Sequence, residues 1–140
     1  MPGSINCRVV GDEFETMRLP VWRDAIAPDG SDVRVLLRLK GGSMAHFRLG
    51  PGLTSRAVAH DSVEEIWYVL RGEGEIWRKS GHRHETVPLA AGTCLSIPVG
   101  THFQFRSFGP DPLEIVGVTM PAWPGDGEAF EVTGPWPPNC

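Results

Sequence analysis

The chain has 140 residues, a formal net charge of −4 and 41% hydrophobic residues, a size and composition that fit one domain spanning 1–140. No cluster of Lys and Arg offers the basic surface that nucleic-acid phosphates require, which argues against nucleic-acid partners. No apolar stretch reaches the ~20 residues needed to cross a bilayer, and the N-terminus lacks an apolar signal-peptide core. We therefore expect a cytoplasmic protein that has no membrane partner.

Short apolar runs separated by glycine and proline follow one another along the chain. None shows helical apolar spacing over three turns, so the runs predict strands. The expected strands, in chain order, cover residues 33–39, 43–49, 56–60, 65–70, 73–78, 85–89, 93–97, 102–108 and 113–119. Many short strands with regular turn signals are typical of an all-β sandwich or barrel.

The segment 121–140 differs from the rest of the chain. It contains five prolines, which remove backbone donors, so it is not expected to form a central strand. It also contains Trp123 and Trp136, which can bury large apolar areas. We expect an extended tail that runs over the barrel, or over a second subunit, and is held there by the two tryptophans.

Two motifs lie within residues 52–106. In the first, Gly52 is followed after five residues by Val58-Ala59-His60, then after four residues by Glu65, and after six more by Gly72. This spacing resembles the first motif of the cupin superfamily, Gly, five residues, His-x-His, three or four residues, Glu, six residues, Gly. Val58 stands where the family has its first histidine.

The second motif resembles that of the same family, which reads Gly, five residues, Pro-x-Gly, two residues, His, three residues, Asn. Here Gly92 is followed after five residues by Pro98-Val99-Gly100, then after one residue by His102, and Arg106 follows after three more. One residue is thus missing before His102, and arginine replaces asparagine. The resemblance implies an all-β, cupin-type double-stranded β-helix, that is, a jelly-roll barrel.

The resemblance also implies a metal site. Alternate side chains of a strand share a face, so His60, Glu65 and His102 can converge if they all point inward. Two imidazoles and a carboxylate form a facial triad that leaves metal positions open for water or substrate. The predicted cofactor is a divalent transition metal, Fe, Mn, Ni or Zn, held by these three residues. If the residue missing before His102 shifts the register of this strand by one, Phe103 and Phe105 face the pocket in place of His102.

Other side chains are candidates for substrate binding. Arg56 and Arg106 could grip an acidic group through paired hydrogen bonds, with Gln104 orienting it. Trp67 is expected to form core or pocket wall, and His46 could act as a replacement ligand or a base.

Three functions remain open. The first is a metal-dependent cupin enzyme, a dioxygenase, isomerase or lyase, that acts on a small polar or acidic molecule through His60 and His102. The second is a non-catalytic module that binds a small ligand. The third is a metal-free sugar or keto-acid isomerase with His60 or His102 as base. A homodimer is expected, because the apolar tail and the strand edges need cover.

Overall fold

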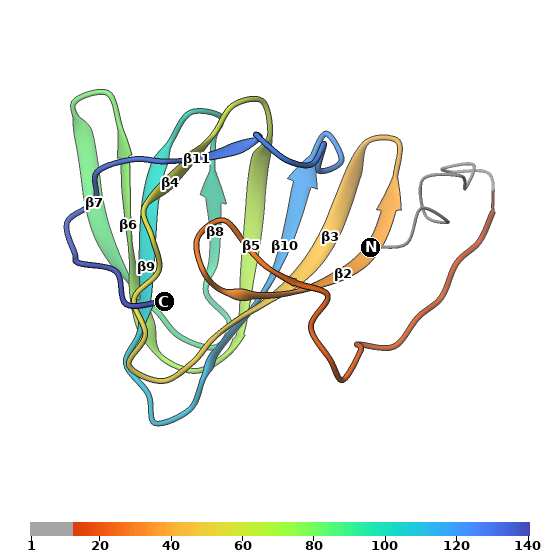
Figure 1. Cartoon of the computed structure of the whole chain (residues 1–140), viewed down its shortest axis with the longest axis horizontal. Helices are drawn as coiled ribbons and strands as arrows, with labels where there is room; N and C mark the ends of the chain where they lie inside the picture. Colours follow the sequence, from red (N-terminus) through yellow and green to blue (C-terminus); the bar gives the residue numbers. More distant parts are fainter. Residues whose placement is uncertain (1–12) are drawn as a thin grey trace.

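A computed structural model describes residues 13–140 and contains two antiparallel sheets (Figure 1). In spatial order, the six-stranded sheet, here sheet A, contains β1 (Ala25–Ile26), β2 (Asp32–Leu39), β3 (Gly42–Leu49), β10 (Leu113–Met120), β5 (Glu64–Arg71) and β8 (Cys94–Ile97). The five-stranded sheet, here sheet B, contains β11 (Ala129–Glu131), β4 (Val58–His60), β9 (His102–Ser107), β6 (Gly74–Ser80) and β7 (Arg83–Leu89). The prediction of an all-β, cupin-type double-stranded β-helix is confirmed.

The core forms between the two sheets because successive side chains of a strand alternate between its faces. Strand β5 shows this alternation clearly, since Glu65, Trp67 and Val69 are buried whereas Ile66 and Tyr68 are exposed. Both sheets contribute to one buried cluster: Leu49, Val58, Trp67, Val69, Ile76, Leu89, Leu95, Ile97, Phe103, Phe105, Leu113 and Ile115. A polar group on the inner face therefore lies in largely apolar surroundings.

The glycine that ends the first motif is required by the turn between β5 and β6. Gly72 has a φ of +88°, and a Cβ at this position would lie 2.4 Å from the carbonyl oxygen of Pro112. Both the left-handed backbone and the contact with backbone exclude a side chain. We expect Gly72→Ala to destabilise the fold by about 2–4 kcal/mol. Urea unfolding measures this value, and Gly81→Ala is the control, because that glycine has a positive φ but open space around it.

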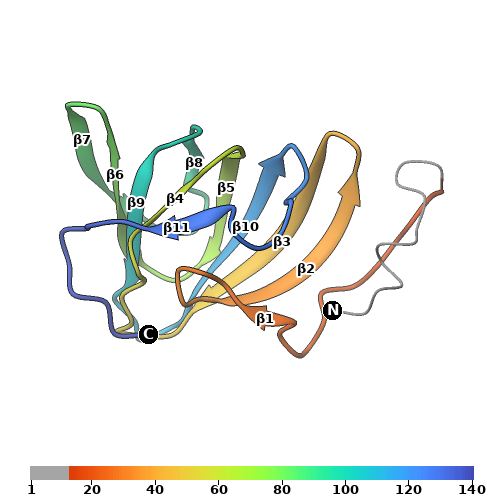
Figure 2. The same ribbon diagram turned by 45° about the horizontal axis from the view of Figure 1, so that its top comes forward.

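Within residues 13–140, no helix is long and apolar enough to span a bilayer. The termini of the described chain differ in placement. Residues 13–22 extend away from the barrel beyond the β2 side of sheet A, whereas the C-terminal tail returns to sheet B (Figures 1 and 2).

Candidate functional site

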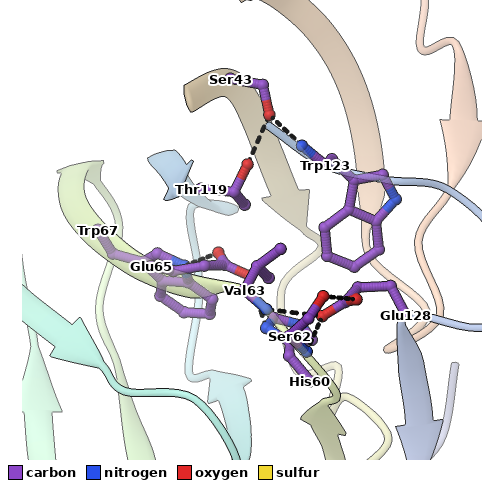
Figure 3. A network of polar contacts seen from close by, with 9 residues as sticks. All are labelled: Ser43, His60, Ser62, Val63, Glu65, Trp67, Thr119, Trp123 and Glu128. Atoms are coloured by element: carbon purple, nitrogen blue, oxygen red, sulfur yellow. Dashed lines mark hydrogen bonds and ion pairs between the residues drawn. The ribbon is translucent and has the colours of Figure 1, made fainter. Parts of the chain in front are cut away.

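A buried imidazole and a buried carboxyl meet where β4 leads into β5. His60 is the last residue of β4, and Glu65 is the second residue of β5. The two side chains are 5% and 4% exposed, and Nδ1 of His60 lies 3.1 Å from Oε2 of Glu65 (Figure 3). This contact lacks hydrogen-bond alignment, so Nδ1 keeps its capacity to accept or donate a proton. The indole N–H of Trp67 donates to Oε1 of Glu65 at 2.7 Å and fixes the carboxyl.

Burial shifts the pKa values of the two groups in opposite directions. Desolvation lowers the pKa of His60 to about 4, against the opposing effect of the nearby Glu128 carboxylate. Desolvation raises the pKa of Glu65 to about 7; the hydrogen bond from Trp67 works against this shift, and the charges of Asp29 and Glu128 add to it. At pH 6 the pair is therefore a neutral imidazole beside a protonated carboxyl, rather than an ion pair.

Aromatic rings enclose His60 on two sides. The ring of Phe103, from β9, and the ring of Trp123, from the tail, both meet it edge to face, with centroids 5.3 Å and 5.2 Å away. The backbone of Trp123 is held by its N–H bond to the Ser43 hydroxyl, which also bonds Thr119 at 2.5 Å. Figure 3 shows the indole of Trp123 over this end of the barrel. The first turn of the tail thus covers the imidazole.

A second carboxyl, Glu128, supports the turn between β4 and β5. It accepts hydrogen bonds from the Ser62 backbone and hydroxyl and from the Val63 backbone, and these bonds lower its pKa although burial opposes them. It is therefore ionised at neutral pH, with its charge close enough to His60 to favour the protonated imidazole. A proton that reaches His60 would be stabilised by this fixed negative charge.

The structure corrects the prediction that His102 points into the barrel. Strand β9 turns Phe103 and Phe105 inward, where both rings contact Trp67, with centroids 5.6 Å and 5.1 Å away. His102 therefore lies on the opposite face, next to Lys79 of β6. Burial of each phenylalanine in the core contributes about 1.5–3 kcal/mol of stability. Turning the strand over would place His102, Gln104 and Arg106 in the apolar core, where burying a polar group costs free energy unless it finds a hydrogen-bond partner. Counted without a deletion, Phe103 itself occupies the histidine position of the second motif.

The residues present do not fit the metal that the cupin resemblance implies. Across residues 13–140, no group of three His, Cys, Asp or Glu side chains is placed to hold an ion. Val58 and Phe103, direct cross-strand partners, stand at two of the three positions where the motifs have histidines. Only His60 and Glu65 remain of the motif ligands, and a transition-metal site of the expected kind needs at least three.

Gln104 and Arg106, predicted to bind substrate, both contact the C-terminal tail. The Gln104 amide donates to the carbonyls of Ser55 and Trp136, and its oxygen accepts the Trp136 backbone N–H. The Arg106 guanidinium lies 4.1 Å from the centroid of the Trp136 ring and bonds to Glu75. The tail therefore runs over the barrel of its own chain, and these two residues fasten it to sheet B.

The other predicted residues lie in separate places. His46 faces the outer side of sheet A, where its Nε2 lies 3.0 Å from Glu114, so it is not part of the inner site. Desolvation lowers the pKa of His46, against the effect of the Glu114 carboxylate. Arg56 is half-buried; its backbone N–H donates to the carbonyl of Asp29, and its charge partly offsets the burial that raises the pKa of the Asp29 carboxyl. Trp67 lies behind Glu65 in the core.

The chain has the fold of a known class of proteins and keeps two of the four ligand positions of its motifs, His60 and Glu65. Residues 45–119, more than half of the chain, match the family described as Cupin domain, and the chain belongs to this family. No curated protein matches the sequence closely enough to count as a relative.

Solved structures share the fold at low identity. An uncharacterised conserved protein with a double-stranded β-helix domain from Klebsiella pneumoniae is 19% identical, with a TM-score of 0.67 over 87% of this chain and 100% of its own. The Streptomyces protein PAC13, solved with uridine, is 17% identical, with a TM-score of 0.64 over 85% of this chain and 92% of its own. KdgF from Halomonas is 18% identical, with a TM-score of 0.60 over 71% and 86% of the two chains.

Proposed function

We propose that this cupin is a metal-independent enzyme that transfers protons within a small polar molecule, as an isomerase or lyase does. The observation that carries the proposal is the buried contact between His60 and Glu65, 3.1 Å apart. Two titratable groups whose surroundings push their pKa values apart are a common arrangement for an acid and a base. The metal-free isomerase expected from the sequence is thus favoured over the metal-dependent enzyme.

The two groups have complementary tasks. His60 is neutral above about pH 4 and can take a proton from substrate carbon or oxygen. Glu65 keeps its proton up to about pH 7 and can deliver it to the leaving or neighbouring oxygen. The ionised Glu128 stabilises the imidazolium between these two transfers. Each task uses a group that the chain itself supplies.

Access and recognition set the class of substrate. Because His60 and Glu65 are almost fully buried, the segment that carries Trp123 has to move before a substrate can reach them. We infer a small molecule. Arg56, whose charge acts on the buried Asp29 carboxyl, favours one with an acidic or hydroxylated group. Keto acids, sugar acids and aldoses belong to this class.

Solvent deuterium provides the test. Protein treated with EDTA is incubated in D2O with a panel of keto acids, hydroxy acids, aldoses and uridine, and proton NMR follows exchange and product formation. Activity that survives EDTA and is not increased by added Mn2+, Fe2+, Ni2+ or Zn2+ supports the proposal. Activity that EDTA abolishes and one of these ions restores would contradict it.

We expect His60→Gln to lower kcat/KM for the substrate found in this screen by about 10²–10⁴-fold, the usual contribution of a general base. Glutamine keeps the polar character and approximate size of the side chain but cannot take the proton. His84→Gln is the matched control, because that histidine is exposed on β7. A fall of less than tenfold in the His60 variant would remove His60 from the catalytic machinery.

The alternative of a non-catalytic binding module also draws on an observation. The aromatic cover over His60 by Trp123 and Phe103 suits a ligand-holding pocket as well as a reaction chamber. Thermal shifts with a panel compound that shows neither exchange nor turnover would favour binding alone.

A further inference from the structure

A surface hollow lies between the β6–β7 hairpin and the turn that leads from β8 to β9. Its volume is about 360 Å³. Figures 1 and 2 show the tip of the hairpin and this turn at the same end of the barrel. The lining includes Arg78, Lys79, Arg83 and Glu85 on the hairpin side, and Ser96 and Thr101 on the other side. Neither His60 nor Glu65 lines it, so the hollow is separate from the inner site.

The hollow is positively charged, although the whole chain has a formal net charge of −4. Arg78, Lys79 and Arg83 supply three positive charges, whereas Glu85 supplies one negative charge. Glu85 compensates for Arg83 only weakly, because their charged atoms lie 3.7 Å apart and both side chains are exposed to water. An excess of positive charge around a hollow attracts anions.

The guanidinium of Arg78 is fixed in position by the protein itself. Its Nη1 donates to the carbonyl of Ser96 at 2.8 Å, and this bond links β6 of sheet B to β8 of sheet A. A guanidinium has five N–H donors in one plane, so a single bond to the protein leaves others for a ligand. Because the long side chain is already held, less entropy is lost when it binds a ligand.

The opposite wall contains a buried hydroxyl that lacks a partner. Thr101 is 3% exposed, and its Oγ1 has no hydrogen-bond partner among residues 13–140. The turn fixes its backbone, since the Thr101 N–H donates to the carbonyl of Pro98 at 3.1 Å. A buried hydroxyl without a partner costs free energy, and a ligand oxygen in the hollow that accepted its proton would remove this cost.

We propose that this hollow binds a tetrahedral dianion, either free phosphate or the phosphate group of a small molecule. The donors stand on two opposite walls, so they suit a ligand whose acceptor oxygens point in several directions. A phosphate group has such oxygens and a charge of about −1.5 to −2 at neutral pH, which matches the excess of positive charge. A carboxylate, which has two oxygens in one plane and a single charge, satisfies fewer of these donors.

Two-dimensional proton–nitrogen NMR of the full-length chain, titrated with inorganic phosphate at pH 8 and constant ionic strength, tests this site. The amide signals of the β6–β7 hairpin and of residues 98–101 should shift together and saturate, with a Kd on the order of 1 mM, an affinity that so small a ligand can reach. Sulfate should shift the same signals, and acetate should bind more weakly. The absence of saturation up to 50 mM phosphate, or acetate binding as tight as that of phosphate, would overturn the proposal.

Three variants locate the binding. Arg78→Gln should weaken phosphate binding about tenfold or more, because it removes a charge-assisted hydrogen bond. Arg83→Gln changes an exposed side chain and should weaken binding without any effect on the fold. Thr101→Val should weaken binding by about 3–10-fold, the contribution of one neutral hydrogen bond. It should not lower Tm, because the hydroxyl has no partner to lose.

Arg38→Gln is the matched control, because it removes the same charge from an exposed position on β2, which lies several strands from β8 in sheet A. Its phosphate affinity should equal that of the wild type. If Arg38→Gln weakened binding as much as Arg78→Gln or Arg83→Gln does, the attraction would come from the overall charge of the chain, and the site would be refuted. A Thr101→Val variant with unchanged affinity would also contradict the proposal, since the hydroxyl would then not contact the ligand.

Discussion

Glu65→Gln is expected to make the protein more stable than the wild type at pH 8, by up to about 3 kcal/mol. The buried carboxyl of Glu65 has a pKa of about 7 in the folded protein, whereas the ordinary pKa of a glutamate side chain, which applies to the unfolded chain, is 4.5. Above pH 7 the folded wild type has to ionise this group in apolar surroundings, whereas a carboxamide carries no such cost. The carboxamide oxygen can still accept the Trp67 N–H.

The sign of the pH dependence follows from the two opposed shifts. Between pH 4.5 and 7 the folded state holds the Glu65 proton that the unfolded state loses, so this group makes stability fall as pH rises. Between pH 4 and 6.5 the unfolded state binds a proton at His60 that the folded state rejects, so this group makes stability rise with pH. In the wild type the contributions of Glu65 and His60 to the pH dependence of stability nearly cancel between pH 4.5 and 6.5, where the two ranges overlap. Glu65→Gln leaves only the contribution of His60.

Guanidinium unfolding at pH 4.5, 6 and 8 measures the effect. The advantage of Glu65→Gln over the wild type should be largest at pH 8 and vanish near pH 4.5. Glu64→Gln is the matched control, because the carboxyl of Glu64 is exposed and its removal should change stability by less than about 0.5 kcal/mol. A Glu65→Gln protein that is less stable than the wild type at pH 8 would refute the protonated state assigned to this carboxyl.

The double substitution Val58→His and Phe103→His is expected to create a transition-metal site that the wild type lacks. The two positions are direct cross-strand partners, both side chains point inward, and the ring of Phe103 already meets that of His60. The change adds volume at one position and removes it at the other, so packing is largely conserved. With His60 and Glu65, four ligands would then surround one point.

Thermal unfolding with EDTA, Zn2+ or Mn2+ detects this gain. At a metal concentration about 100-fold above Kd, binding adds about 2.7 kcal/mol, a rise of about 5–10 °C in Tm for a chain of this size. The wild type should shift by less than about 1 °C. Adding Glu65→Gln to the double variant is the control, and it should remove most of the gain. If metal raised the Tm of the wild type as much as that of the double variant, the residues of the wild type would be sufficient to bind the metal, and the account would be contradicted.

The strand pattern of the barrel could be predicted from the sequence because it depends on local alternation and turn residues. Each of the nine expected strands lies within two residues of an observed one, from β2 to β10. The short strands β1 and β11 were not predicted, since two or three residues carry no period. They exist because β2 and β4 offer them backbone partners.

The site was only partly predictable. The spacing from Gly52 to Gly72 identified His60 and Glu65, which do meet in the barrel. Alternation in β9 defined two sets of side chains but not which set faces inward, and aromatic burial decides that question. The strict motif count, which ends on Phe103, was the available signal.

The contributions of Trp123 and Glu128 depend on the path of the tail, which brings them beside residues about 60 positions earlier in the chain. No local pattern reports such long-range placement. The prolines and tryptophans of the tail predicted that it would be extended and anchored, but not which residue it would cover.

The protonation state of the buried pair is the central claim, and carbon-13 NMR of the Glu65 carboxyl against pH measures it directly, with Glu65→Gln to assign the signal. The account predicts a midpoint near pH 7, together with a His60 imidazole that stays neutral down to about pH 4. A carboxyl midpoint near 4.5 with an imidazole midpoint near 6.5 would show an ordinary ion pair, and the proposed acid–base chemistry would then lose its basis.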